Sequence, residues 1–337
     1  VYTRSALKDS DVAVAFTMQI SVDNNHTEAI IADGAQINQK PAYRSDEQEV
    51  SVNAETEFEL VNMAGVFDFG LNAENLVFGP LLDLRNKDKK AALQKRASKL
   101  VEFGVEAEKD AYGTSFQWID ISNHTVAAIG GSSPVGNDGE TSSKLTPSGD
   151  PARVHSGPSG GVSVTAKDDL LHIGFVDSGA KTEDGKFAFA GSGQVFRYNP
   201  RDGGGTTAMI GSGTEITGGS VEVMAADDVK LISQNGDFIT GDSTGSVGIG
   251  VTYIELNRRV RAYIGDENGE SMAATKIDLD DDAEVTVEAE SEGFVVSLAL
   301  AGSVRTDPPP AENEDGQVEA PEEAQEDNGN GANAGKS

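Results

Sequence analysis

Short segments in which apolar and polar residues alternate recur four times along the chain. Each reads valine, polar residue, valine, variable residue, alanine, and the four begin at Val50, Val162, Val221 and Val285. Alternation with a period of two puts both valines on one face of a β-strand. Each segment leads into a second apolar strand that ends near a glycine, at Gly65, Gly179, Gly236 and Gly302. The pattern therefore predicts a repeated arrangement of strands.

A longer alternating strand precedes each valine motif, within residues 12–22, 115–121, 193–198 and 247–256. In the first of these strands one face carries only apolar side chains, namely Val12, Val14, Phe16, Met18, Ile20 and Val22. This spacing fits a strand and no helix phase. A turn and a short apolar segment then lead to the valine motif. Four features that recur in the same order four times indicate an internal repeat.

The repeat determines the expected fold class. A block of about 60 residues with short strands cannot bury both faces of those strands alone, whereas stacking on its neighbours builds one continuous core. We therefore predict an all-β fold, a parallel β-helix (solenoid). The alternative is a string of tandem β-sandwich modules, each with a core of its own. In the solenoid, we expect four valines to point inward and contact their equivalents: Val221, Val223, Val285 and Val287. Glu222, Thr286 and Glu288 should point outward.

Two segments interrupt the repeat, and a third follows it. An insertion at about residues 66–110 has the apolar spacing of an α-helix, with seven basic residues between Arg85 and Lys99. This basic helix could be a lid over an open edge of the solenoid or a docking surface for an acidic partner. A loop at about residues 132–161 is rich in Gly, Pro and Ser. We assign residues 1–305 to the repeat domain and residues 306–337 to an acidic disordered linker or tail.

Charge and composition narrow the function classes. The chain has 56 acidic and 26 basic residues, a formal net charge of −30, which argues against nucleic-acid binding and against an anionic membrane surface. Cysteine is absent, so disulfides, thiolate metal sites and a cysteine nucleophile are excluded. No run approaches the roughly 18 apolar residues of a membrane span. The first residue is Val1, and we expect the chain to be a piece of a longer polypeptide whose export signal lies elsewhere.

One stretch carries a family resemblance. The run from Asn257 to Asp266, followed by the valine motif at Val285, resembles the repeat of large secreted filamentous adhesins of the filamentous haemagglutinin and leukotoxin type. The matching residues are Asn257, Ala262, Tyr263, Ile264, Gly265 and Asp266, and more loosely Asn25, Thr27, Ala29, Ile31, Gly34, Asn123, Thr125, Ala127, Ile129 and Gly130. The resemblance covers roughly residues 12–302 outside the insertion and the loop. It implies a right-handed parallel β-helix in a long fibre that is extracellular or on the cell surface.

The candidate chemistry is sparse. The histidines, His26, His124, His155 and His172, show neither HxH nor HExxH spacing. His26 and His124 fall in equivalent turns of two repeats, which indicates a structural position. The Asn-His-Thr triplets that contain them match the N-glycosylation pattern, but a recurring turn is the plainer interpretation.

Two acidic segments offer oxygen ligands for calcium. One contains Asp266, Asn268 and Glu270, and the other Asp278, Asp280 and Asp282. The second segment lacks the glycine and glutamate of an EF-hand loop, and chance clustering is expected among 56 acidic residues. Solvated acidic turns are therefore the simpler interpretation. We predict no catalytic residue and no cofactor, with calcium left open.

The sequence thus favours a non-enzymatic structural and adhesive segment of a large secreted or cell-surface protein that mediates attachment to cells or surfaces. The expected partners are a cell-surface glycan or protein, or other segments of the same giant chain. The alternatives are a β-helical polysaccharide lyase or hydrolase, which needs carboxylates and a basic residue converging in one groove, and a phage-type fibre segment, which should trimerise.

Overall fold

The structure is a computed structural model that describes residues 2–3, 7–65, 105–130, 150–182, 186–200, 204–241, 244–265 and 273–304. Apart from a short 3-10 helix, η1 (Pro41–Tyr43), the regular structure of these residues is β-strand, as predicted. The α-helix expected in the insertion lies outside the described residues, and so does the tail after Thr306. The insertion is shorter than predicted, because residues 105–110 already belong to a strand.

The first array of strands contains the long strands that precede the valine motifs. It consists of β2 (Leu7–Ile31), β5 (Val105–Ile129), β8 (Phe187–Tyr198) with β9 (Gly205–Gly211), and β12 (Gly245–Leu256) with β13 (Val260–Gly265). Neighbouring members pair in parallel in this order. Val14 pairs with Tyr112, which pairs with Phe189, and Phe189 pairs with Val247. Each block therefore adds one strand beside its equivalent in the preceding block.

The second array contains the valine motifs. It consists of β4 (Val50–Gly65), β7 (Gly161–Thr182), β11 (Ser220–Gly241) and β15 (Val285–Val304), with β1 (Tyr2–Thr3) beside β4. These strands also pair in parallel, and the motifs lie in register: Val50 with Val162, Val162 with Val221, and Val221 with Val285. The motif and the apolar stretch after it form one continuous strand. The alignment of the valine motifs is thereby confirmed, whereas the glycines after them are offset by two residues: Gly65 and Gly236 both lie opposite Asp177.

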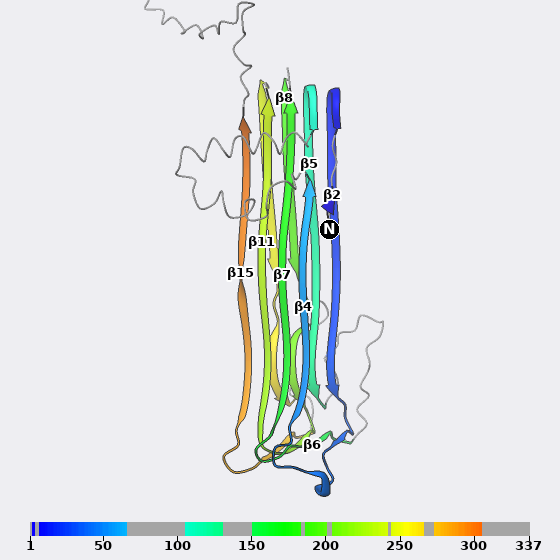
Figure 1. Ribbon diagram of the computed structural model, residues 1–337, viewed down its shortest axis with the longest axis vertical. Coiled ribbons are helices and arrows are strands. Elements are labelled where there is room, and N and C mark those ends of the chain that lie inside the picture. The colour runs from blue at the N-terminus through cyan, green and yellow to red at the C-terminus, as the bar shows by residue number, and fades with distance from the viewer. Residues whose placement is uncertain are drawn as a thin grey trace, which may run out of the picture.

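A short sheet connects the arrays at one end. Its parallel strands are β3 (Gln36–Ile37), β6 (Arg153–His155), β10 (Glu215–Gly218) and β14 (Lys276–Leu279). In Figure 1 the long strands run along the vertical axis and β6 lies at their lower end. At the other end, Val105–Ala107 of β5 pair with Ala180–Thr182 of β7, so the large sheet nearly closes on itself.

Two sequence expectations fail here. Residues 132–161 are not irregular throughout, because β6 forms within them, and its Val154 is 1% exposed in the core. β6 has only three residues, which is too short for an alternating pattern to be recognised in a segment rich in Gly, Pro and Ser. Tandem β-sandwich modules are not seen either, since every strand pairing among the described residues is parallel, and the long pairings join different blocks. Among these residues no helix has the length and apolar character of a membrane span.

The interior alternates between apolar and polar layers. Beside the short sheet lies a cluster that contains Val162, Val164, Val221 and Val223. A second cluster around Leu170 and Phe196, and an alanine-rich third one around Ala180, follow along the strands. Along β7 the layers are separated by inward polar side chains, of which Asp168, His172 and Ser178 are at most 3% exposed.

The last strand departs from the predicted core. Val221 and Val223 are 1% and 0% exposed, as predicted, whereas their register partners Val285 and Val287 are 44% and 45% exposed. In a stack of parallel strands a side chain is covered by its equivalents on both sides. β15 pairs only with β11 among the described strands, so its valines are covered on one side.

Candidate functional site

The outer face of the first array, meaning the face turned away from the second array, presents an apolar surface. In β2 the inward side chains are small or polar, with Ala13, Ala15, Thr17 and Gln19 all at most 6% exposed. The apolar residues of the alternation point outward instead. They are about half exposed, from 49% at Met18 to 61% at Val22.

Register extends this surface across four strands. We call the set the apolar ladder, and it comprises Val12, Val14, Phe16, Met18, Ile20 and Val22 of β2, Tyr112, Phe116 and Trp118 of β5, Phe189 and Val195 of β8, and Val247, Ile249, Val251 and Tyr253 of β12. With a rise of about 3.3 Å per residue and about 4.8 Å between strands, it covers roughly 600 Å². This matches the largest apolar patches of ordinary monomers, which are often functional.

Glycines in β8 make room for the aromatic rings of the ladder. A Cβ at Gly193 would lie 3.0 Å from the Phe116 ring, and one at Gly191 would lie 3.0 Å from the Phe189 ring. The two rings therefore occupy the space above these glycines. The apolar ladder is bordered by a row of charged residues from β5, β8 and β12. In this row Arg197 forms ion pairs with Glu255 at 3.0 Å and with Asp120 at 4.0 Å.

Beyond this row the same outer face carries a cluster of His26, Glu28 and His124. His26 of β2 pairs with His124 of β5, and their rings stack with centroids 4.6 Å apart and planes 4° from parallel. Glu28 lies two residues after His26, and its Oε1 is 3.0 Å from His26 Nε2. The ligand atoms of the three residues all lie within 4.8 Å of one another. The sequence analysis missed this cluster because it placed both histidines in turns, although their equivalent positions in two repeats were a signal that could have found it.

Both Asn-His-Thr triplets lie inside long strands and not in turns, contrary to expectation. Their asparagines point inward, and Asn25 Nδ2 donates to Asn123 Oδ1 at 2.9 Å. Asn123 is 0% exposed and its own amide donates to Asp168 Oδ1 at 2.8 Å. A glycan on Asn123 would therefore be incompatible with the folded chain.

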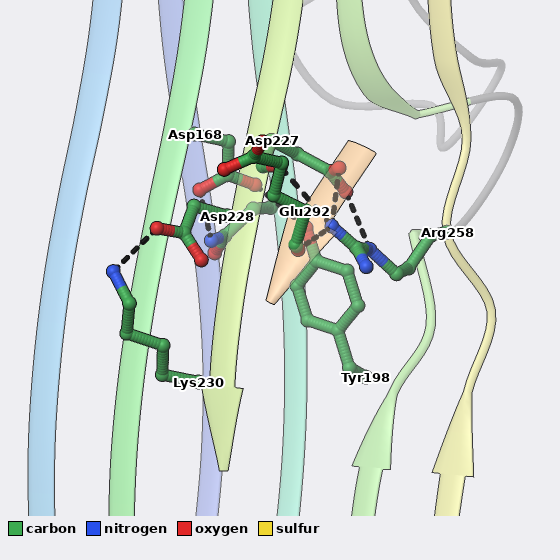
Figure 2. A network of polar contacts seen from close by, with 8 residues as sticks. Asp168, Tyr198, Asp227, Asp228, Lys230, Arg258 and Glu292 are labelled. Carbon is green, nitrogen blue, oxygen red and sulfur yellow. Dashed lines mark hydrogen bonds and ion pairs between the residues drawn. The ribbon is translucent and has the colours of Figure 1, made fainter. Parts of the chain in front are cut away.

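A buried polar network lies behind these strands (Figure 2). Tyr198 donates its hydroxyl to Asp168 Oδ2 at 2.6 Å. Burial raises the pKa of Asp168 to about 6, although these hydrogen bonds favour its charged form. Asp227 lies beside Asp168 in the register and receives two hydrogen bonds from Arg258, from Nε at 2.9 Å and from Nη2 at 2.5 Å. Arg258 thus neutralises the charge of Asp227.

A chain of amides crosses the next polar layer. Gln194 donates to Gln117, Gln117 donates to Gln19 at 3.0 Å, and Gln19 donates to Asn62 at 3.0 Å. Ser233 begins the chain by donating to Gln194. Because each glutamine both accepts and donates, three blocks are linked inside the protein by one directed chain.

The far end of the interior contains two further carboxyl groups. Burial, and then the neighbouring Asp237, raise the pKa of Asp177 to about 8. Burial raises the pKa of Asp237 to about 6, and Ser178 donates to it at 2.6 Å. A cavity of about 10 Å³ nearby, lined by Ser115 and Ser178 among others, has room for one water molecule.

The remaining candidates of the sequence analysis are separate from these groups. His155 hydrogen-bonds Thr217 in the short sheet at 2.9 Å, and burial lowers the pKa of His172 to about 3. Asp278, Asp280 and Asp282 are exposed at and after β14, and they do not form a three-ligand group of the kind found at His26. Asp266, Asn268 and Glu270 lie outside the described residues. Calcium binding at either segment stays a prediction.

Comparisons with known proteins place the chain in no family. No family model matches the sequence, no curated protein matches it, and no solved structure matches the chain.

Proposed function

We propose that the chain is a non-enzymatic structural and adhesive segment of a large secreted or cell-surface filament, and that its blocks are successive turns of a right-handed parallel β-helix. The observation that carries the proposal is the register of equivalent residues from four blocks, such as Val50, Val162, Val221 and Val285. A repeat that adds one strand to each array per block extends the molecule along a single axis.

The apolar ladder supports the adhesive part of the proposal. Its polar atoms are few, namely the hydroxyls of Tyr112 and Tyr253 and the indole N–H of Trp118, and it has the dimensions of a sheet that packs face to face on another sheet. Its roughly 600 Å² approaches the ~800 Å² per partner of a stable protein interface. We therefore propose that the apolar ladder binds a second copy of this chain, with the two ladders packed face to face. The net charge of −30 opposes this contact, so association should strengthen with salt.

Sedimentation velocity over a range of protein and salt concentrations tests this assignment. The parent chain should form dimers that increase with salt, and Phe16→Lys should remain monomeric because it places a cation in the ladder. Phe294→Lys is the matched control: Phe294 is 47% exposed, against 58% for Phe16, but it belongs to β15 of the second array. A monomeric parent chain, or equal loss in both variants, would contradict the assignment. A trimer would favour the phage-type fibre.

The alternative of a polysaccharide-cleaving enzyme depends on carboxylates that a glycan can reach. Asp168, Asp227 and Arg258 do converge, but the two carboxylates are 0% and 3% exposed between the arrays. A sugar chain could contact them only if the sheets separated. Their burial therefore supports a structural role for this network.

A further inference from the structure

The cluster of His26, Glu28 and His124 offers three ligand atoms for one metal ion. His26 and Glu28 come from β2, and His124 comes from β5 of the following block. The donor set is two imidazole nitrogens and one carboxylate oxygen, all within 4.8 Å of one another. Imidazole and carboxylate together suit zinc and similar transition-metal ions, and three protein ligands leave a fourth position for water.

The backbone already holds the three residues in place. Parallel pairing in register fixes His26 opposite His124, and the period of two puts Glu28 on the same outer face as His26. Zn–N bonds of about 2.0–2.1 Å require donor atoms roughly 3.3 Å apart in a tetrahedral site. The farthest pair of ligand atoms must therefore approach by at most about 1.5 Å, which rotation of side chains can supply. The stacked rings must also tilt, because imidazole lone pairs lie in the ring plane and those of parallel rings do not converge.

Burial and charge fit an ion that enters from solvent. His124 is 8% exposed, whereas the side chains of Glu28 and His26 are 18% and 47% exposed. His124 is thus the most buried of the three ligands, and His26 is the one most open to solution. The acidic surface raises the local concentration of cations.

We propose that His26, Glu28 and His124 bind one divalent transition-metal ion, with zinc as the representative, and that the ion links the strand of the first block to that of the second. The proposal is independent of the proposed function. β2 pairs only with β5 among the described strands of its array, so the link would act on an edge strand. An ion that binds only the folded chain would raise its unfolding temperature.

Isothermal titration of the EDTA-treated, dialysed full chain with zinc chloride at about pH 7.5 tests this site, because neutral imidazoles are needed for binding. We expect one ion per chain, and at least tenfold weaker binding in His26→Ala and in Glu28→Gln. Both residues are partly exposed, so neither variant should prevent folding. His155→Ala is the control, since His155 lies in the short sheet and should leave binding unchanged.

Two further measurements distinguish this site from general binding to acidic residues. Cobalt should show the visible bands of a tetrahedral nitrogen- and oxygen-ligated ion in the parent chain and lose them in His26→Ala. Zinc binding should weaken at least tenfold at about pH 5.5, where histidine is protonated. Equal zinc affinity in the parent chain and His26→Ala, or several ions bound with calcium competing equally, would overturn the proposal. Failure to bind zinc at all would do the same.

Discussion

At the scale of the residue, this protein buries polar side chains and exposes apolar ones along the same strand. Gln19 is 3% exposed between two outward residues of β2, Met18 and Ile20, which are 49% and 58% exposed. Burying an amide is costly unless it is hydrogen-bonded. Here the register supplies the partner, because Gln117 lies opposite Gln19 in the next block and donates to it. Hydrogen bonds between equivalent residues of successive blocks thus offset the cost of burying polar side chains. The apolar face of β2 then remains on the outside of the protein.

Position within the stack determines what an inward substitution costs. Val223→Asp puts a carboxyl group at a 0% exposed position and should reduce the free energy of unfolding by several kcal/mol. Val287→Asp, at the register partner that is 45% exposed, should cost about 1 kcal/mol or less, because water still reaches the carboxylate. Urea unfolding midpoints measure both. Equal costs would mean that β15 is covered in solution, and an equally damaging Glu222→Lys would mean that the alternation has the wrong phase.

At the scale of the element, the strands depend on glycine where the amide chain crosses the interior. Gly174 of β7 lies in register between Asn62 and Ser233. A Cβ at this position would collide with Gln194 Nε2 and approach Gln117 Oε1 to 3.0 Å. The two glutamines occupy the space that a side chain on β7 would need. The absence of a side chain in one array is therefore matched to a long side chain in the other.

Gly174→Ala should destabilise the protein by about 1–3 kcal/mol, because Gln194 must leave its place in the chain of amides. In Gly174→Ala combined with Gln194→Ala the collision disappears, so the combined cost should be smaller than the sum of the two single costs. Gly302→Ala in β15 is the matched control, since a Cβ there meets no atom within 4 Å. Thermal unfolding of the four variants and the parent chain measures the coupling. Simple additivity at Gly174 and Gln194 would show that the amide chain does not occupy this space.

At the scale of the whole molecule, charge and buried carboxyl groups act on stability in the same direction. The pKa of Asp177 is raised to about 8, and those of Asp168 and Asp237 to about 6. A group whose pKa is raised on folding stabilises the folded state at low pH, and that contribution is lost as pH rises through the folded pKa. The net charge of −30 adds self-repulsion that also decreases as acids are protonated.

Stability should therefore increase as pH falls from about 9 to about 6.5, by at least about 1 kcal/mol. Asp177 dominates this window, because the unfolded histidines reach half protonation only at its lower end. His172, with its pKa lowered to about 3, acts in the opposite sense between about pH 6.5 and pH 3. Urea unfolding at several pH values measures the slope, and Asp177→Asn should flatten it. A slope that survives this change would contradict the assignment to Asp177.

The periodicity of the sequence by itself determined the strands, their four-fold repetition and the register of the valine motifs, because alternation and recurrence are local properties of the chain. It did not determine which face of β2 turns inward, since a strand offers two faces and only the opposing array decides between them. The triplets at Asn25 and Asn123 looked like turns, yet long-range pairing extends them into strands. The repeat aligned His26 with His124, but their meeting with Glu28 on one outer face depends on the triplets being strands and not turns, which the sequence did not show. Contacts between distant blocks are made by the tertiary structure, and the interior, the apolar ladder and the candidate metal site all depend on them.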